Sequence, residues 1–69
     1  MDDSAEDLAG AQGKFVVFLA SLLQRAGVVS VTEFASLLAA FATTTSETSP
    51  EEGDLLAGWA AAVRALVPH

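Results

Sequence analysis

Apolar residues recur at helical spacing in three segments of the chain, and polar or turn-forming residues separate these segments. In the first segment the apolar positions alternate between spacings of three and four residues, which predicts one face of an amphipathic helix: Leu8, Ala11, Phe15, Phe18 and Leu22. Nothing in the pattern indicates a pair of strands. The sequence predicts an all-α chain, with a disordered acidic N-terminus at 1–4, helices at about 5–26, 31–43 and 50–67, and a polar linker at 44–49.

The first predicted helix is apolar over an unusually wide arc. On a helical wheel the arc covers roughly 200°, whereas the stripe of an ordinary surface helix covers about 100°. One contact surface is too narrow to cover such an arc, so we expect neighbours on two sides. Phe15, Phe18, Leu19 and Leu22 would face one neighbour, and Val16, Ala20 and Leu23 would face another.

The residues between the first and second helices encode a short turn. Gly27 suits the left-handed position that follows a helix, where Val28 can then contact Leu23 in a Schellman motif. Ser30 and Glu33 match a capping box at the start of the next helix. These signals predict that the first two helices form a helical hairpin.

The third helix has its own start signal. Ser49 and Glu52 match a second capping box, and Pro50 suits the first helical position. A row of small residues follows at intervals of four, and we interpret it as a solvent face rather than as a close helix contact: Gly53, Ala57, Ala61 and Ala65. The linker length leaves open whether this helix packs on its own chain or on a partner chain.

Size and composition favour self-association. The chain has 69 residues, of which 52% are hydrophobic, and it has no cysteine. A domain this small is marginal without disulfides, a metal or oligomerisation, and the one histidine is the last residue, His69. We therefore predict an oligomeric helical bundle, most simply a two-fold homodimer. The predicted interface comprises Leu8, Ala11, Phe15, Phe18, Leu19, Leu22, Leu23, Phe34, Phe41 and Trp59.

The net charge of −6 restricts the partners. Nucleic acids and anionic membrane surfaces attract basic proteins, so neither is expected as a partner. The segment FVVFLASLL, residues 15–23, is well short of the roughly 20 residues that span a bilayer. The acidic N-terminus also lacks the basic start of a signal peptide. These observations predict a cytoplasmic protein that associates with itself, and they leave open whether it also binds another protein.

No arrangement of residues predicts catalysis or a cofactor. A nucleophile requires a neighbouring base, and His69 at the chain end is the single histidine. Glu51, Glu52 and Asp54 could suggest a metal site, but acidic residues are also favoured at the start of a helix. We therefore expect no catalytic residue, no cofactor and no metal, and we expect the chain not to be an enzyme.

Three functional hypotheses follow from the sequence. The first is a non-catalytic module for protein–protein interaction and oligomerisation, acting as an adaptor, regulator or accessory subunit. The second is a carrier of a small apolar ligand in a cavity lined by phenylalanines between helices. The third is a small structural subunit of an enzyme complex. The wide apolar arc and the few chemically reactive groups favour the first.

Overall fold

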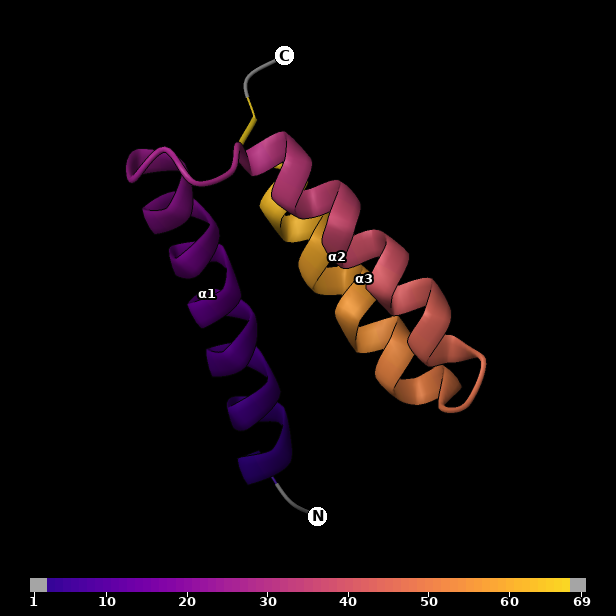
Figure 1. The fold of residues 1–69 in the computed structure, drawn as a ribbon. Coiled ribbons are helices and arrows are strands. Elements are labelled where there is room, and N and C mark those ends of the chain that lie inside the picture. The colour runs from indigo at the N-terminus through magenta and orange to yellow at the C-terminus, as the bar shows by residue number, and fades with distance from the viewer. Residues whose placement is uncertain (1–2, 68–69) are drawn as a thin grey trace.

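The chain folds into three helices arranged as a V. The structure, a computed structural model, describes residues 3–67, in which the elements are α1 (Asp3–Arg25), α2 (Val31–Ser46) and α3 (Pro50–Arg64) and no strand occurs. α2 and α3 run antiparallel and side by side, whereas α1 meets them near one end and diverges toward the other (Figure 1). The prediction of an all-α chain with three helices is confirmed.

The turn between α1 and α2 has the predicted geometry. Gly27 has a φ of +77°, and the N–H of Val28 donates to the carbonyl of Leu23 at 2.9 Å, as in a Schellman motif. The hydroxyl of Ser30 accepts a hydrogen bond from the N–H of Glu33 at 3.0 Å. The turn is therefore fixed by local hydrogen bonds at the end of one helix and at the start of the next.

Helix ends differ from the predicted ones in three places. α1 begins at Asp3, inside the segment predicted to be disordered, of which residues 1–2 lie outside the described residues. α2 continues to Ser46, beyond the predicted end at residue 43, and the hydroxyls of Thr43 and Thr44 donate to carbonyls one turn earlier. α3 ends at Arg64, and residues 65–67 form tighter turns in place of the predicted last helical turn.

The predicted second capping box does not form. Ser49 occupies the N-cap position of α3, but its side chain makes no capping hydrogen bond. Its backbone has ψ of 89°, whereas the effective cap Ser30 has ψ of 158°, so the two hydroxyls are directed differently relative to their helices. Pro50 follows at the first helical position as predicted, where its missing N–H has no structural cost.

Small residues allow α2 and α3 to pack closely. Ala35, Ala42 and Ala60 are buried, and so is Gly53. A Cβ added at Gly53 would lie 2.9 Å from the Cα of Ser46, so the two backbones approach each other there. The interpretation of the small-residue row as a solvent face is therefore wrong at Gly53, although Ala57, Ala61 and Ala65 are exposed.

α1 joins the other helices through a limited contact. Ala20 lies in the buried core with Val31, Ala35 and Val63, and Val16 and Val17 pack against that core. α1 and α2 are joined by the predicted short turn, but they contact each other only to a limited extent. The closely packed pair is α2 and α3. The physical reason is that small residues face each other between α2 and α3, whereas α1 diverges from both of them (Figure 1).

Candidate interaction surface

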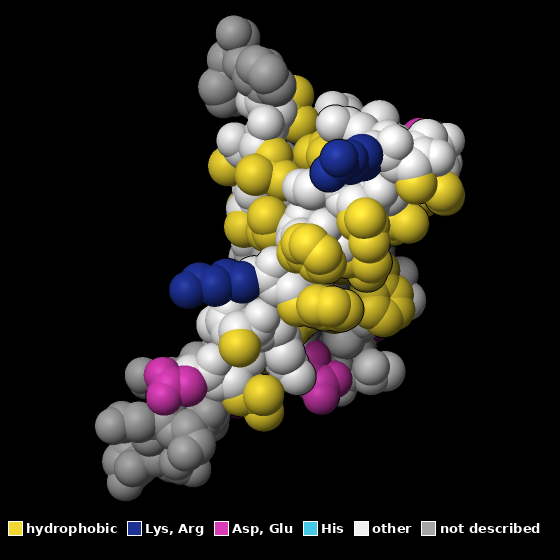
Figure 2. Space-filling view, turned by 90° about the vertical axis from the view of Figure 1, so that its left-hand side faces the viewer, with side chains coloured by type: hydrophobic (Ala, Val, Ile, Leu, Met, Phe, Trp, Pro, Cys, Tyr) yellow, Lys and Arg dark blue, Asp and Glu magenta, His cyan; other side chains and the backbone are white. Residues whose placement is uncertain are grey.

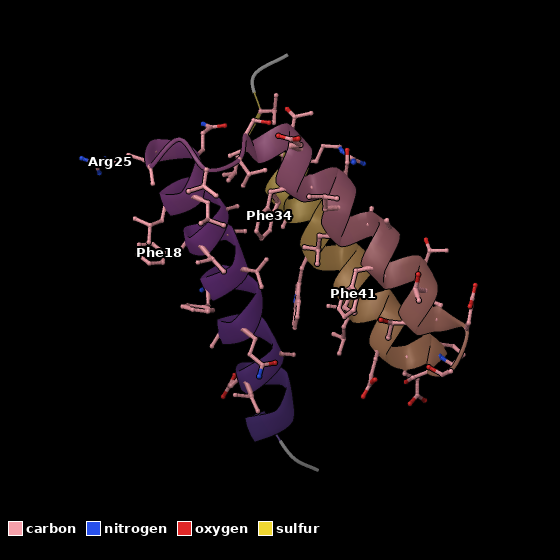
Figure 3. The ribbon with its side chains drawn as sticks, in the orientation of Figure 1. Phe18, Arg25, Phe34 and Phe41 are labelled. Carbon is pink, nitrogen blue, oxygen red and sulfur yellow. The ribbon has the colours of Figure 1, made fainter. Side chains whose placement is uncertain are left out.

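The outer face of α1 carries a stripe of large apolar side chains exposed to solvent. Leu8 is 59% exposed, Phe15 and Phe18 are each 60% exposed, and Leu22 is 49% exposed. Phe18 points away from the other two helices (Figure 3). In the space-filling view from this side, hydrophobic side chains gather in the centre, with basic groups to the left and above (Figure 2). We call Leu8, Ala11, Phe15, Phe18 and Leu22 the α1 stripe.

The structure divides the ten predicted interface residues between several environments. The five residues of the α1 stripe are exposed and share one face of α1. Leu19 and Leu23 are half-buried at the edge of that face. Phe34 is half-buried and packs on the core, and Figure 3 shows it on the side of α2 that faces α1. Phe41 and Trp59 lie apart from the α1 stripe and line a groove.

The groove lies in the open part of the V, where all three helices contribute side chains. Its volume is about 430 Å³ and it is open to solvent. Its lining residues are Gln12, Phe41, Thr45, Glu52, Leu55, Leu56 and Trp59, which we call the V groove. Phe41 is 58% exposed and Leu55 is 46% exposed, so their apolar surfaces are accessible in the single chain.

Trp59 bridges α3 and α1 through a contact that the sequence analysis missed. A Cβ added at Gly13 would lie 2.8 Å from both Cδ1 and Nε1 of Trp59, so the indole rests directly on the backbone of α1. At Gly10, one turn earlier, the same addition would meet nothing within 4 Å. The signal available in the sequence was a glycine within a helix, which is unfavourable unless a neighbour needs the space.

Gln24 connects α1 to α2 through a hydrogen bond that the sequence analysis did not identify. Its side-chain oxygen accepts a hydrogen bond from the N–H of Val31 at 2.7 Å. Val31 is the first residue of α2, and its N–H has no partner within the helix. Gln24 thereby connects the last turn of α1 to the first turn of α2 and helps to hold the angle at which the V opens.

The ligand-carrier hypothesis expects the phenylalanines to line one cavity, but they lie in separate places. Phe15 and Phe18 lie in the α1 stripe, Phe34 packs on the core, and Phe41 lines the V groove. Among the described side chains, those of residues 7–67, no group of three or more metal-ligating side chains is placed to hold an ion. In that same part of the chain, no helix combines the length and hydropathy needed to cross a membrane.

Among the described residues, the buried core contains only small side chains. Its hydrophobic members are alanines and valines: Ala20, Val31, Ala35, Ala42, Ala60 and Val63. Every leucine, phenylalanine and tryptophan of the chain is at least partly exposed. Large side chains contribute most to the stability of a hydrophobic core when they are buried. In the single chain, much of their apolar surface instead remains exposed to solvent.

Comparisons of the chain with protein-family models, with curated protein sequences and with solved structures found no match.

Proposed function

We propose that the chain is a small helical protein–protein interaction module that has no catalytic role of its own and pairs with a second copy through the α1 stripe. The observation that carries the proposal is the exposure of the stripe, in which four large side chains are 49–60% exposed along one helix face. Contiguous exposed apolar surface of this kind marks interaction sites in small proteins.

The accessible surface of the whole chain supports this proposal. It measures 4889 Å², whereas a compact monomer of this mass, 7.1 kDa, exposes about 4,100 Å². The difference of roughly 800 Å² is the area that each partner contributes to a protein interface of standard size. A second copy packed against α1 would therefore bring the buried fraction close to that of an ordinary compact protein.

Charge favours an antiparallel pairing of the two α1 helices. Asp7 and Arg25 are both exposed and lie 18 residues apart, roughly five full turns, so they share one side of the helix. If two copies cross antiparallel near Val16, Arg25 of each copy lies beside Asp7 of the other. A parallel pairing lacks these opposite-charge contacts. Exposed ion pairs contribute little affinity, but they set orientation.

The experiment that tests the pairing is light scattering on a sizing column at micromolar concentration. We expect the unmodified chain to elute as a dimer. Phe18→Glu should elute as a folded monomer, because it places a charge at the centre of the interface and its side chain is 60% exposed in the single chain. Helicity measured by circular dichroism should be retained.

The matched control is Leu37→Glu in α2. Leu37 is 64% exposed and lies on a different helix from the stripe. This variant should remain a dimer. A monomeric unmodified chain, or a dimer that survives Phe18→Glu, contradicts the proposed interface.

A further inference from the structure

The V groove and the α1 stripe are separate surfaces with different chemistry. The stripe lies on the outer face of α1, whereas the groove is lined from inside the V by Phe41, Leu55, Leu56 and Trp59. Its polar members include Glu52, and no basic residue lines it. None of the residues that line the groove belongs to the α1 stripe.

Apart from Arg64 at the end of α3, the charged residues of the hairpin formed by α2 and α3 are all acidic. Between Arg25 and Arg64 the sequence contains no lysine and no arginine. The same span contains five acidic residues, four of which lie close to the connection between α2 and α3: Glu33, Glu47, Glu51, Glu52 and Asp54. Figure 1 shows that this connection lies at the open end of the V. Lys14 lines a different groove, which shares Trp59 with this one.

From these observations we infer that the V groove binds an amphipathic helix of a basic partner protein. The apolar face of that helix packs on Phe41, Leu55 and Trp59, and its basic flank faces Glu52 and the acidic end of the hairpin. Helices that bind grooves present apolar anchors at positions i, i+3, i+4 and i+7, which lie on one helix face. The inference rests on the proposed role as an interaction module and names the chemistry of its partner, but it does not require the α1 dimer.

Charge is the reason for assigning the groove to a foreign helix rather than to a second copy. Each helix of a second copy has more acidic than basic residues, so none offers a net positive charge to the acidic rim, and like charges across an interface disfavour association. Its basic groups in helix α1, Lys14 and Arg25, are accompanied by the acidic residues at the start of the same helix. A helix with a net positive charge meets no such opposition.

The shape of the groove also favours a helix over a small ligand. Pockets for small molecules bury most of the ligand surface, whereas this groove is open along the V. An open apolar groove covers one face of an elongated partner and leaves the other face in water. The volume of about 430 Å³ suits the side chains of such a face.

The probe for this inference is a synthetic helical peptide of about 18 residues, with leucines on one face and lysines on both flanks. Trp59 is the only tryptophan of the chain and lines the groove. Binding removes water from its indole, so its emission should shift to shorter wavelength during titration. The control peptide carries glutamate at every lysine position and should bind at least tenfold more weakly.

Two pairs of variants locate the binding site. Phe41→Ser should weaken binding about tenfold, as expected for loss of an aromatic anchor, whereas Phe18→Ser, at a position of similar exposure on the α1 stripe, should leave it unchanged. Glu52→Gln should weaken it about threefold, as expected for one exposed ion pair. Glu33→Gln removes the same charge at the other end of the hairpin and should have no effect.

Each outcome decides between named alternatives. Equal binding of the glutamate peptide overturns the basic partner. Binding without a shift in Trp59 emission, or unaffected by Phe41→Ser, overturns the groove as the site. Peptide binding that dissociates the unmodified dimer assigns the groove to a second copy. Phe18→Glu separates the two proposals, since this variant should be monomeric and should still bind the peptide with unchanged affinity.

Discussion

Single hydrogen bonds at the start of α2 have effects beyond their own residue. Gln24 belongs to α1, yet its side-chain oxygen accepts the N–H of Val31 in α2 at 2.7 Å. Ser30 accepts the N–H of Glu33 in the same turn. The start of α2 is thus stabilised partly from within the turn and partly from the preceding helix, which links the stability of α2 to the orientation of α1.

Replacing Gln24 tests this link. Gln24→Ala leaves the N–H of Val31, a buried residue, without its acceptor, so we expect the free energy of unfolding to fall by about 1 kcal/mol. Gln24→Glu keeps an acceptor oxygen, and its negative charge is favourable at the start of α2 but unfavourable at the end of α1, so its stability should stay close to that of the unmodified chain. Urea denaturation at fixed protein concentration measures both. Equal midpoints for Gln24→Ala and the unmodified chain would show that the bond contributes nothing.

Helices α2 and α3 depend on the absence of a side chain at one position. Gly53 lies against Ser46, with no space for a Cβ. Gly58, in the same helix, has nothing within 4 Å of an added Cβ and is exposed. The two glycines therefore have opposite structural roles within α3.

Alanine substitution should separate these roles. Gly53→Ala should lower the free energy of unfolding by about 1–3 kcal/mol, because the added methyl forces the helices apart. Gly58→Ala should raise it by up to about 1 kcal/mol, since alanine favours the helix more than glycine does. Thermal denaturation compares the two variants directly. If Gly53→Ala were as stable as Gly58→Ala, the close approach of α2 and α3 would be in doubt.

The sequence predicts the helices and their first turn because those features depend on neighbouring residues. The spacing of apolar residues marks α1, and Gly27 and Ser30 mark the turn through their own backbone and side-chain hydrogen bonds. The predicted end of α2 is too early because threonine has a low intrinsic helix propensity, whereas the backbone stays helical through the threonines to Ser46.

The arrangement of the helices could not be predicted in the same way. The contact of Gly13 with Trp59 joins residues that are far apart in the sequence, and glycine within a helix suggests only that something requires the space. Likewise, Gly53 and Ala57 belong to the same row of small residues at intervals of four, but Gly53 is buried and Ala57 is exposed. Which face of a helix is covered depends on where its neighbouring helices lie. The spacing of apolar residues along the sequence does not specify their positions.

The whole molecule is more extended than its length requires. Its radius of gyration is 12.5 Å, whereas a compact chain of this length has a value of about 11 Å. The divergence of α1 accounts for this shape (Figure 1). A core of alanines and valines provides limited stability to a single copy, so the stability of the fold and the pairing of copies should be coupled.

This coupling predicts a melting temperature that depends on protein concentration. For a dimer that unfolds as it dissociates, a tenfold increase in concentration should raise the melting temperature by about 5 °C for chains of this size. Phe18→Glu should melt at one temperature throughout the same range. Thermal denaturation followed by circular dichroism provides the measurement, and an unmodified chain without concentration dependence would argue against a coupled dimer.

The tight α2–α3 hairpin also has a consequence for the order of folding. Only residues 47–49 join α2 to α3. Contacts between segments that are close in sequence form quickly. α1 is synthesised before both of them, since translation proceeds from the N-terminus. During synthesis, α1 therefore leaves the ribosome without the hairpin that later covers its inner face. If copies pair through the α1 stripe as proposed, the helix that completes its packing last within one chain is the first available for pairing between chains.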